Sequence, residues 1–154
     1  MMAEQALALV AVAGAETEQF WERVRLLLPP GIRVELYHVV DEAPAWELGM
    51  QFARRPGHPR PPGLDARVRE AETRGSDAIL AGARTAIGRS ATEALGRGRP
   101  EREIVSRAAN VGASLVVVGA RPGEDRTAPE PHSLGHVSRF VVDHAPCPVL
   151  LVRL

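Results

Sequence analysis

The sequence predicts an α/β protein in which strands and helices alternate along the chain and build a parallel sheet covered by helices on both faces. Short apolar runs bounded by glycine, at residues 7–12 and 115–118, are typical of buried parallel strands. Segments with apolar residues at helical spacing lie between such runs, for example at residues 16–28. The 154 residues are enough for one domain with its own core, which we expect to span residues 1–154.

The first half of the chain contains three regular elements before the pattern breaks. Residues 7–12 are almost continuously apolar and predict a central strand. Residues 16–28 predict a helix, because an acidic first turn precedes the apolar stripe and a Pro-Pro-Gly sequence stops it. Residues 32–40 alternate between apolar and charged side chains and predict the second strand. Periodicity then disappears in residues 41–63, where Pro56, Pro59, Pro61 and Pro62 crowd together and predict a long exposed loop.

The second half resumes the alternation of helices and strands. Residues 64–87 predict a helix with a bend or break at Gly75 and Ser76. The remaining predicted elements are a weak strand at 91–95, a helix at 100–111 that starts at a proline, a strand at 115–118, a short helix at 137–142 and a strand at 149–152. Residues 121–133 carry no periodicity. The resulting order, β-α-β-α-β-α-β-α-β, is typical of right-handed crossovers in one sheet.

Composition excludes several classes of function. Nineteen basic residues balance nineteen acidic ones, so nothing in the net charge favours a nucleic-acid or membrane-surface partner. The basic residues are all arginine, which excludes a lysine Schiff base and a P-loop lysine. The lone Cys147 cannot form an internal disulfide and, between prolines, is interpreted as a small packed residue, so a cytoplasmic location is expected. No apolar run reaches the length of a membrane span.

Three candidate chemical sites are weak on the residues alone. His132 and His136 have a spacing that could bind a metal on a helix, but nearby prolines argue against a helix there. Ser133 and Ser138 lack the Gly-x-Ser-x-Gly context of an activated nucleophile. His144 lies near the end of a predicted helix, where it is expected to act as a cap. No metal site and no catalytic residue are therefore predicted.

Three segments near the carboxyl terminus resemble the C-terminal signature of the universal stress protein family. They are Ala113-Ser-Leu-Val-Val-Val-Gly-Ala-Arg121, Gly135-His-Val-Ser-Arg139 and His144-Ala-Pro-Cys-Pro-Val-Leu-Leu-Val-Arg153. Upstream, Tyr37-His-Val-Val-Asp41 and the pair Arg99-Pro100 fall where that family has its second strand and third helix. The resemblance covers nearly the whole chain and implies a Rossmann-like, five-stranded parallel sheet with strand order 3-2-1-4-5.

The resemblance also implies a binding site, because many members of the family bind ATP or AMP where the first strand meets the fourth. At that position the reversal of strand order separates the loops at the carboxyl ends of the strands and opens a crevice. The candidate residues for this nucleotide crevice are Ala13, Gly14, Val40, Gly119, Arg121, Gly123, Gly135, His136 and Val137. Backbone N–H groups at the glycines and at a helix start near Gly135 would face the phosphates.

The sequence departs from the pattern of the nucleotide-binding members. Ala13 stands where those members have an aspartate, and Pro122 replaces the second glycine of their phosphate loop. Gly135 arrives about three residues late, and His136 replaces the small hydroxyl residue that follows. Proline offers no N–H, and imidazole is bulkier than a hydroxyl beside a phosphate. We therefore predict that residues 121–134 form a remodelled loop and that the nucleotide site is degenerate.

The leading functional prediction is a non-enzymatic regulatory or stress-response protein without a cofactor, acting on a protein partner that the sequence does not identify. It is expected to form a homodimer through the last strand, at Val149, Leu150, Leu151 and Val152, because an exposed apolar edge invites pairing. One alternative is an ATP or AMP sensor that uses a rebuilt loop at residues 119–137, where Arg121 could hold an anion. A slow ATP hydrolase is the other alternative.

Overall fold

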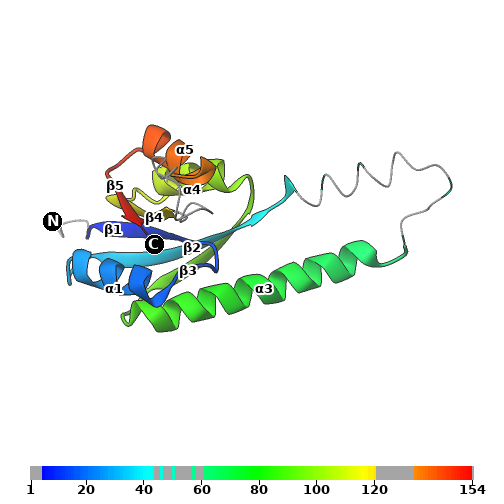
Figure 1. Ribbon diagram of the computed structural model, residues 1–154, viewed down its shortest axis with the longest axis horizontal. Coiled ribbons are helices and arrows are strands. Elements are labelled where there is room, and N and C mark those ends of the chain that lie inside the picture. Colours follow the sequence, from blue (N-terminus) through cyan, green and yellow to red (C-terminus); the bar gives the residue numbers. More distant parts are fainter. Residues whose placement is uncertain are drawn as a thin grey trace, which may run out of the picture.

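The structure is a computed structural model, and it describes residues 5–43, 46, 50, 57, 61–120 and 134–153. In chain order, the elements are β1 (Leu7–Val12), α1 (Glu18–Leu27), β2 (Arg33–Asp41), α3 (Leu64–Ile87), β3 (Thr92–Gly98), α4 (Pro100–Asn110), β4 (Leu115–Ala120), α5 (His136–His144) and β5 (Val149–Arg153). All strand pairs are parallel, and the order across the sheet is β3-β2-β1-β4-β5 (Figure 1). Within the described ranges, no helix is long and apolar enough to cross a membrane. The predicted alternation and strand order are confirmed.

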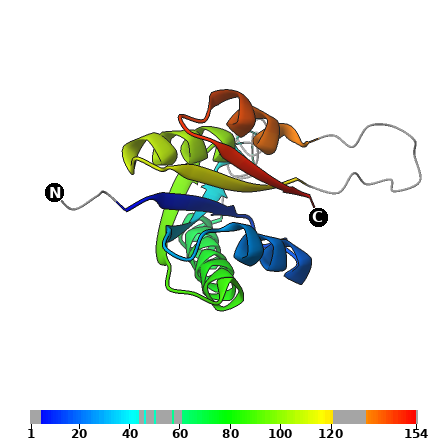
Figure 2. The same ribbon diagram turned by 90° about the vertical axis from the view of Figure 1, so that its left-hand side faces the viewer.

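The sheet is the middle layer of three. Helices α1 and α3 lie on one side of it, and α4 and α5 lie on the other (Figure 2). Each side has its own apolar cluster: Phe20 and Ile87 belong to the first, and Leu9 and Val141 to the second. Strand β1 contributes to both clusters because successive side chains of a strand point to opposite faces. This double burial explains the continuous apolar run at its position.

Local sequence signals set several boundaries. Thr17 is the N-cap of α1, and its side chain accepts a hydrogen bond from the N–H of Phe20. Pro100 occupies the first turn of α4, where its missing N–H has no helical partner to lose. Gly88 ends α3 in the left-handed conformation, with φ of 65°. These signals fix the ends of the helices and therefore the loops between helices and strands.

Two predictions of local structure are wrong. Helix α3 is continuous from Leu64 to Ile87, without a break at Gly75 and Ser76 (Figure 1). Ser76 is buried and its hydroxyl is satisfied by donating to the carbonyl of Glu72 at 2.8 Å, so packing keeps this turn helical. The edge strand β3 extends to Gly98, beyond the predicted 91–95, because it pairs with β2 up to Asp41.

The segment 41–63, predicted as irregular, is described at only a few positions. Ala43, Trp46 and Met50 have helical backbone, and the N–H of Trp46 donates to the carbonyl of Glu42 at 3.1 Å. The expectation of an irregular loop is therefore wrong at these residues. Trp46 is 72% exposed and therefore does not belong to the core.

Candidate functional site: a crevice at the carboxyl ends of the strands

A crevice opens at the carboxyl ends of β1, β2 and β4, on the side of the sheet that carries α4 and α5. Its volume is about 450 Å³. Its described lining consists of Ala11, Val12, Ala13, Ala15, Glu16, Tyr37, His38, Val39, Asp41, Pro100, Ile104, Val118, Gly119, Leu134, Gly135, His136, Val137 and Ser138. The strand order reverses between β1 and β4, so the connections from these strands run to opposite faces and leave space between them.

The loop after β1 forms one wall of the crevice and is closed by a carboxylate. The N–H groups of Ala13 and Gly14 donate to Oε1 and Oε2 of Glu16 at 2.6 and 2.9 Å. Gly14 has φ of 88°, which favours glycine, and a Cβ atom there would lie 2.8 Å from Cγ1 of Ile79 on α3. The residue at position 14 must therefore be glycine for the loop to turn against α3.

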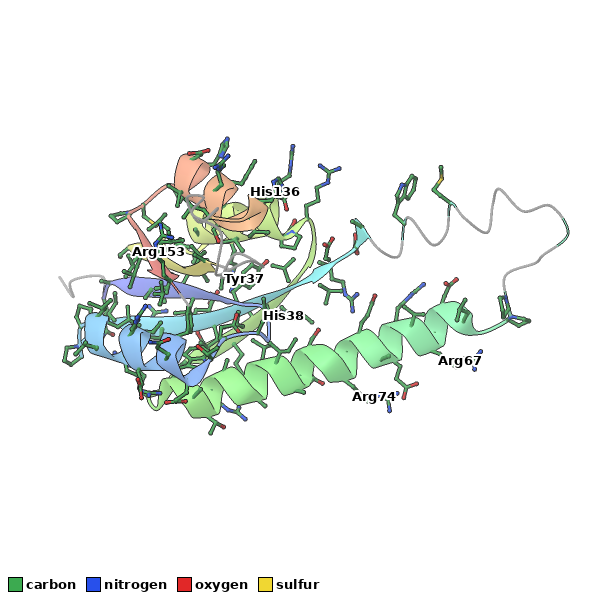
Figure 3. The ribbon with its side chains drawn as sticks, viewed as in Figure 1. Tyr37, His38, Arg67, Arg74, His136 and Arg153 are labelled. Atoms are coloured by element: carbon green, nitrogen blue, oxygen red, sulfur yellow. The ribbon has the colours of Figure 1, made fainter. Side chains whose placement is uncertain are left out.

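Strand β2 supplies aromatic and imidazole groups to the next wall, where Tyr37 and His38 follow one another (Figure 3). Nδ1 of His38 lies 2.8 Å from the carbonyl oxygen of Val12, its partner in the β1–β2 register. A carbonyl oxygen can only accept, so Nδ1 carries the proton. In the neutral ring, Nε2 is then an acceptor.

Behind this wall, a partly buried ion pair lies against Tyr37. Arg107 of α4 donates from Nε and Nη2 to the two carboxylate oxygens of Glu35 at 2.7 and 3.0 Å. Its guanidinium carbon lies 5.7 Å from the centroid of the Tyr37 ring. The hydrogen bond to Glu35 raises the pKa of Arg107. Burial, with a smaller effect of Glu103, raises the pKa of Tyr37, so its phenol stays neutral beside the crevice.

Strand β4 and α5 form the opposite wall. Gly119 and the start of α5 at Gly135, His136 and Val137 line the crevice. The hydroxyl of Ser138 is buried and donates to the carbonyl of Gly119 at 2.9 Å, which ties α5 to the end of β4. Nε2 of the largely exposed His136 lies 3.4 Å from Oε1 of Glu101, a buried carboxylate in the first turn of α4.

The structure brings most of the predicted site residues together. Ala13, Gly119, Gly135, His136 and Val137 line the crevice. Gly14 packs against α3 beside it, and Val40 is buried in β2 without lining it. Since side chains alternate along a strand, the neighbouring positions, Val39 and Asp41, face the crevice instead. Arg121 and Gly123 lie outside the described residues.

The polar contacts that Glu16, His38, Glu101 and Ser138 make at the site were not predicted from the sequence. Glu16 lies close to the end of β1 in the sequence, and Glu101 lies at the start of α4, so both could have been suspected. Their partners could not, because the fold determines which groups a flexible carboxylate contacts. The bond from His38 to Val12 follows from the register between two strands far apart in the sequence.

Other candidate residues have structural roles. Cys147 is half-buried and burial raises its pKa, as expected for a packed thiol. His144 is the last residue of α5 and its Nδ1 lies 2.9 Å from the carbonyl of Phe140, which agrees with the predicted capping role. In the part of the chain that the structure describes, no group of three or more histidine, cysteine, aspartate or glutamate residues is placed to hold a metal ion.

The fold and the crevice together define a doubly wound α/β protein with a ligand-sized cleft at its topological switch point. The chain matches the Universal stress protein family over residues 5–153. It therefore belongs to that family, as the resemblance in the sequence implied.

Solved structures agree on the fold. Hypothetical protein MJ0577 is 19% identical with a TM-score of 0.72, over 99% of this chain and 98% of that one. Universal stress protein UspA from Lactobacillus plantarum is 20% identical with a TM-score of 0.64, over 98% and 99%. A universal stress protein family protein from Arabidopsis thaliana, solved with AMP bound, is 18% identical with a TM-score of 0.59, over 96% and 91%. None of the curated proteins compared with the chain matches it.

Proposed function

We propose that this protein is a non-enzymatic, cytoplasmic stress-response regulator whose crevice does not hold ATP or AMP through the family's phosphate loop. The observation that carries the proposal is the pairing of His136 with Glu101 at the start of α5. Phosphates would be expected beside that helix start. The buried Glu101 carboxylate places a negative charge next to this position, and the His136 side chain already has it as a partner.

Two further features support this proposal. The Ser138 hydroxyl, the nearest hydroxyl in the first turn of α5, already donates to the carbonyl of Gly119. Ala13 has a methyl group where nucleotide-binding members have a carboxylate. Each hydrogen bond to a charged ligand contributes about 1.5–3 kcal/mol, so the loss of two moves a micromolar dissociation constant toward the millimolar range.

Calorimetric titration with AMP and ATP tests the proposal. We expect dissociation constants near or above about 1 mM, and no difference between the wild type and Gly119→Trp, whose side chain fills the crevice. Micromolar binding that Gly119→Trp abolishes would overturn the proposal. The rate of phosphate release from ATP should be the same for the wild type and for Gly119→Trp. A higher rate in the wild type would favour the slow ATP hydrolase.

The second candidate is an ATP or AMP sensor that uses the loop at residues 119–137. The size of the crevice and the AMP bound to the Arabidopsis relative favour it. In this case Arg121 would contact the phosphates. Arg121→Ala should then weaken AMP binding at least about tenfold, while Arg67→Ala, on the exposed amino-terminal part of α3 (Figure 3), should not.

We also propose that the protein forms a homodimer through β5. Strand β5 is an edge of the sheet, and Val149, Leu150 and Leu151 are only partly buried. The opposite edge, β3, carries ion pairs from Glu93 to Arg84 and from Arg97 to Glu72, which oppose strand pairing. Sedimentation should give a dimer at micromolar concentration, and a monomer there would contradict this proposal.

A further inference from the structure

The β1–β2 side of the crevice presents hydrogen-bond acceptors. Adjacent backbone N–H groups at the end of a strand form a concavity that can hold an anion. At Ala13 and Gly14 that position is taken by the chain's own carboxylate, since Glu16 accepts from both N–H groups at 2.6 and 2.9 Å. The loop therefore offers a ligand the negative charge of Glu16 in place of two donors.

Two neighbouring groups have the same polarity. His38 donates from Nδ1 to the carbonyl of Val12, so its Nε2 is an acceptor in the neutral ring. Asp41 lines the crevice as a carboxylate and accepts from the N–H of Ala43 at 3.0 Å. None of the described lining residues is an arginine. The two carboxylates on this side thus repel an anion and complement hydrogen-bond donors, while the neutral Tyr37 hydroxyl can both donate and accept.

We propose that Glu16 makes the crevice selective against anions, so that its ligand carries no negative charge and donates hydrogen bonds to the acceptor wall. The remaining lining supplies apolar contact through Ala11, Val39, Ile104 and Val118, which suits a flat or ring-shaped molecule. This inference rests on the proposed function, in which the phosphate-loop mode is lost. It adds the chemical class of the ligand and the residue that determines it.

Adenosine and AMP are suitable probes because they differ only by the phosphate. We expect the wild type to bind adenosine at least about tenfold more tightly than AMP, a difference of roughly 1.4 kcal/mol. Glu16→Gln should raise the affinity for AMP by about the same factor, because it removes the charge and keeps an oxygen that can accept. Glu22→Gln removes one charge from the exposed surface of α1, outside the crevice, and should leave both affinities unchanged.

A second measurement does not depend on a variant. Raising the salt concentration screens the repulsion between Glu16 and the phosphate, so AMP binding by the wild type should not weaken with salt. A site that held phosphate with arginine would lose affinity instead.

The outcomes separate this inference from the proposed function. If adenosine does not bind and Glu16→Gln changes AMP affinity no more than Glu22→Gln, the inference is wrong and the proposed function stands. If the wild type binds AMP more tightly than adenosine and Gly119→Trp abolishes that binding, both are wrong. Adenosine binding with weak AMP binding that Glu16→Gln strengthens supports both.

Discussion

The two faces of the sheet differ in the kind of side chain that they bury. The face covered by α1 and α3 is a continuous apolar cluster with Phe20 fully buried. The face covered by α4 and α5 has a smaller apolar cluster, and three of the four buried polar residues in the described chain, Glu35, Glu101 and Ser138, lie on it. The crevice opens on this second face.

The difference suggests separate roles: the first face contributes mainly to stability, and the second carries the polar groups near the crevice. Apolar burial on the first face contributes free energy without specifying a ligand. On the second face, polar groups are fixed by each other, as in the pairs of Glu35 with Arg107 and His136 with Glu101. We propose that such groups influence which ligands the crevice accepts, and the loss of one partner leaves the other unpaired on this face.

The largest effect is expected from Phe20→Ala on the apolar face. Phe20 is 0% exposed, so its removal leaves a cavity that costs about 3–5 kcal/mol of unfolding free energy. Leu26→Ala on the same helix is the control, because Leu26 is 83% exposed, and it should change stability by less than about 0.5 kcal/mol. Urea denaturation measures both. Equal effects would show that this face is not the apolar core.

On the other face, Arg107→Gln is expected to cost about 2–3 kcal/mol. It leaves the Glu35 carboxylate, whose side chain is only 10% exposed, without its bidentate partner. The control is Arg84→Gln, which breaks the more exposed pair with Glu93 and should cost less than about 1 kcal/mol. The same denaturation experiment compares them, and similar small losses would indicate that water replaces Arg107 easily.

Adding a methyl group at two glycines, Gly96 and Gly82, compares how closely the structure packs at each position. A Cβ at Gly96 of β3 would lie 2.1 Å from the Tyr37 hydroxyl oxygen, so Gly96→Ala must displace the ring and should cost about 1–2 kcal/mol. Gly82→Ala on α3 meets no atom within 4 Å and should stabilise the protein by about 0.5–1 kcal/mol. If both substitutions shift the melting temperature in the same direction, the close approach of Gly96 to the Tyr37 ring is contradicted.

The smallest effect concerns the reactivity of Cys147, which packs against the cluster of the second face. Burial raises its pKa, so less thiolate is present at neutral pH than in a free cysteine. Alkylation by iodoacetamide should be slower than for free cysteine in the folded protein and equal to it in denaturant. Rapid alkylation of the folded protein would show that the thiol is exposed.

Much of the fold could be predicted from local pattern, because β1 and β4 are continuous apolar runs and α1 has an unambiguous stop. The break predicted at Gly75 and Ser76 was wrong, since tertiary packing of Ser76 outweighs the weak helix propensity of these residues. The strand order came from family resemblance, and the position of the crevice follows from it.

The polar details of the site could not be predicted from the sequence. The bonds of Glu16 depend on the turn after β1, and the bond of His38 depends on strand register. Likewise, Glu35 alternates with apolar residues in β2, and this pattern does not indicate a buried charge. The structure buries it against Arg107, 72 residues away in the sequence.

The most direct test of the central claim is the melting temperature of the wild type with and without millimolar ATP. A dissociation constant near 1 mM contributes about 0.4 kcal/mol of stability at equal ligand concentration and should raise the melting temperature by about 1–2 °C. Gly119→Trp should show no larger shift. A shift of about 6 °C or more that is lost in Gly119→Trp would correspond to tight binding and contradict a degenerate nucleotide site.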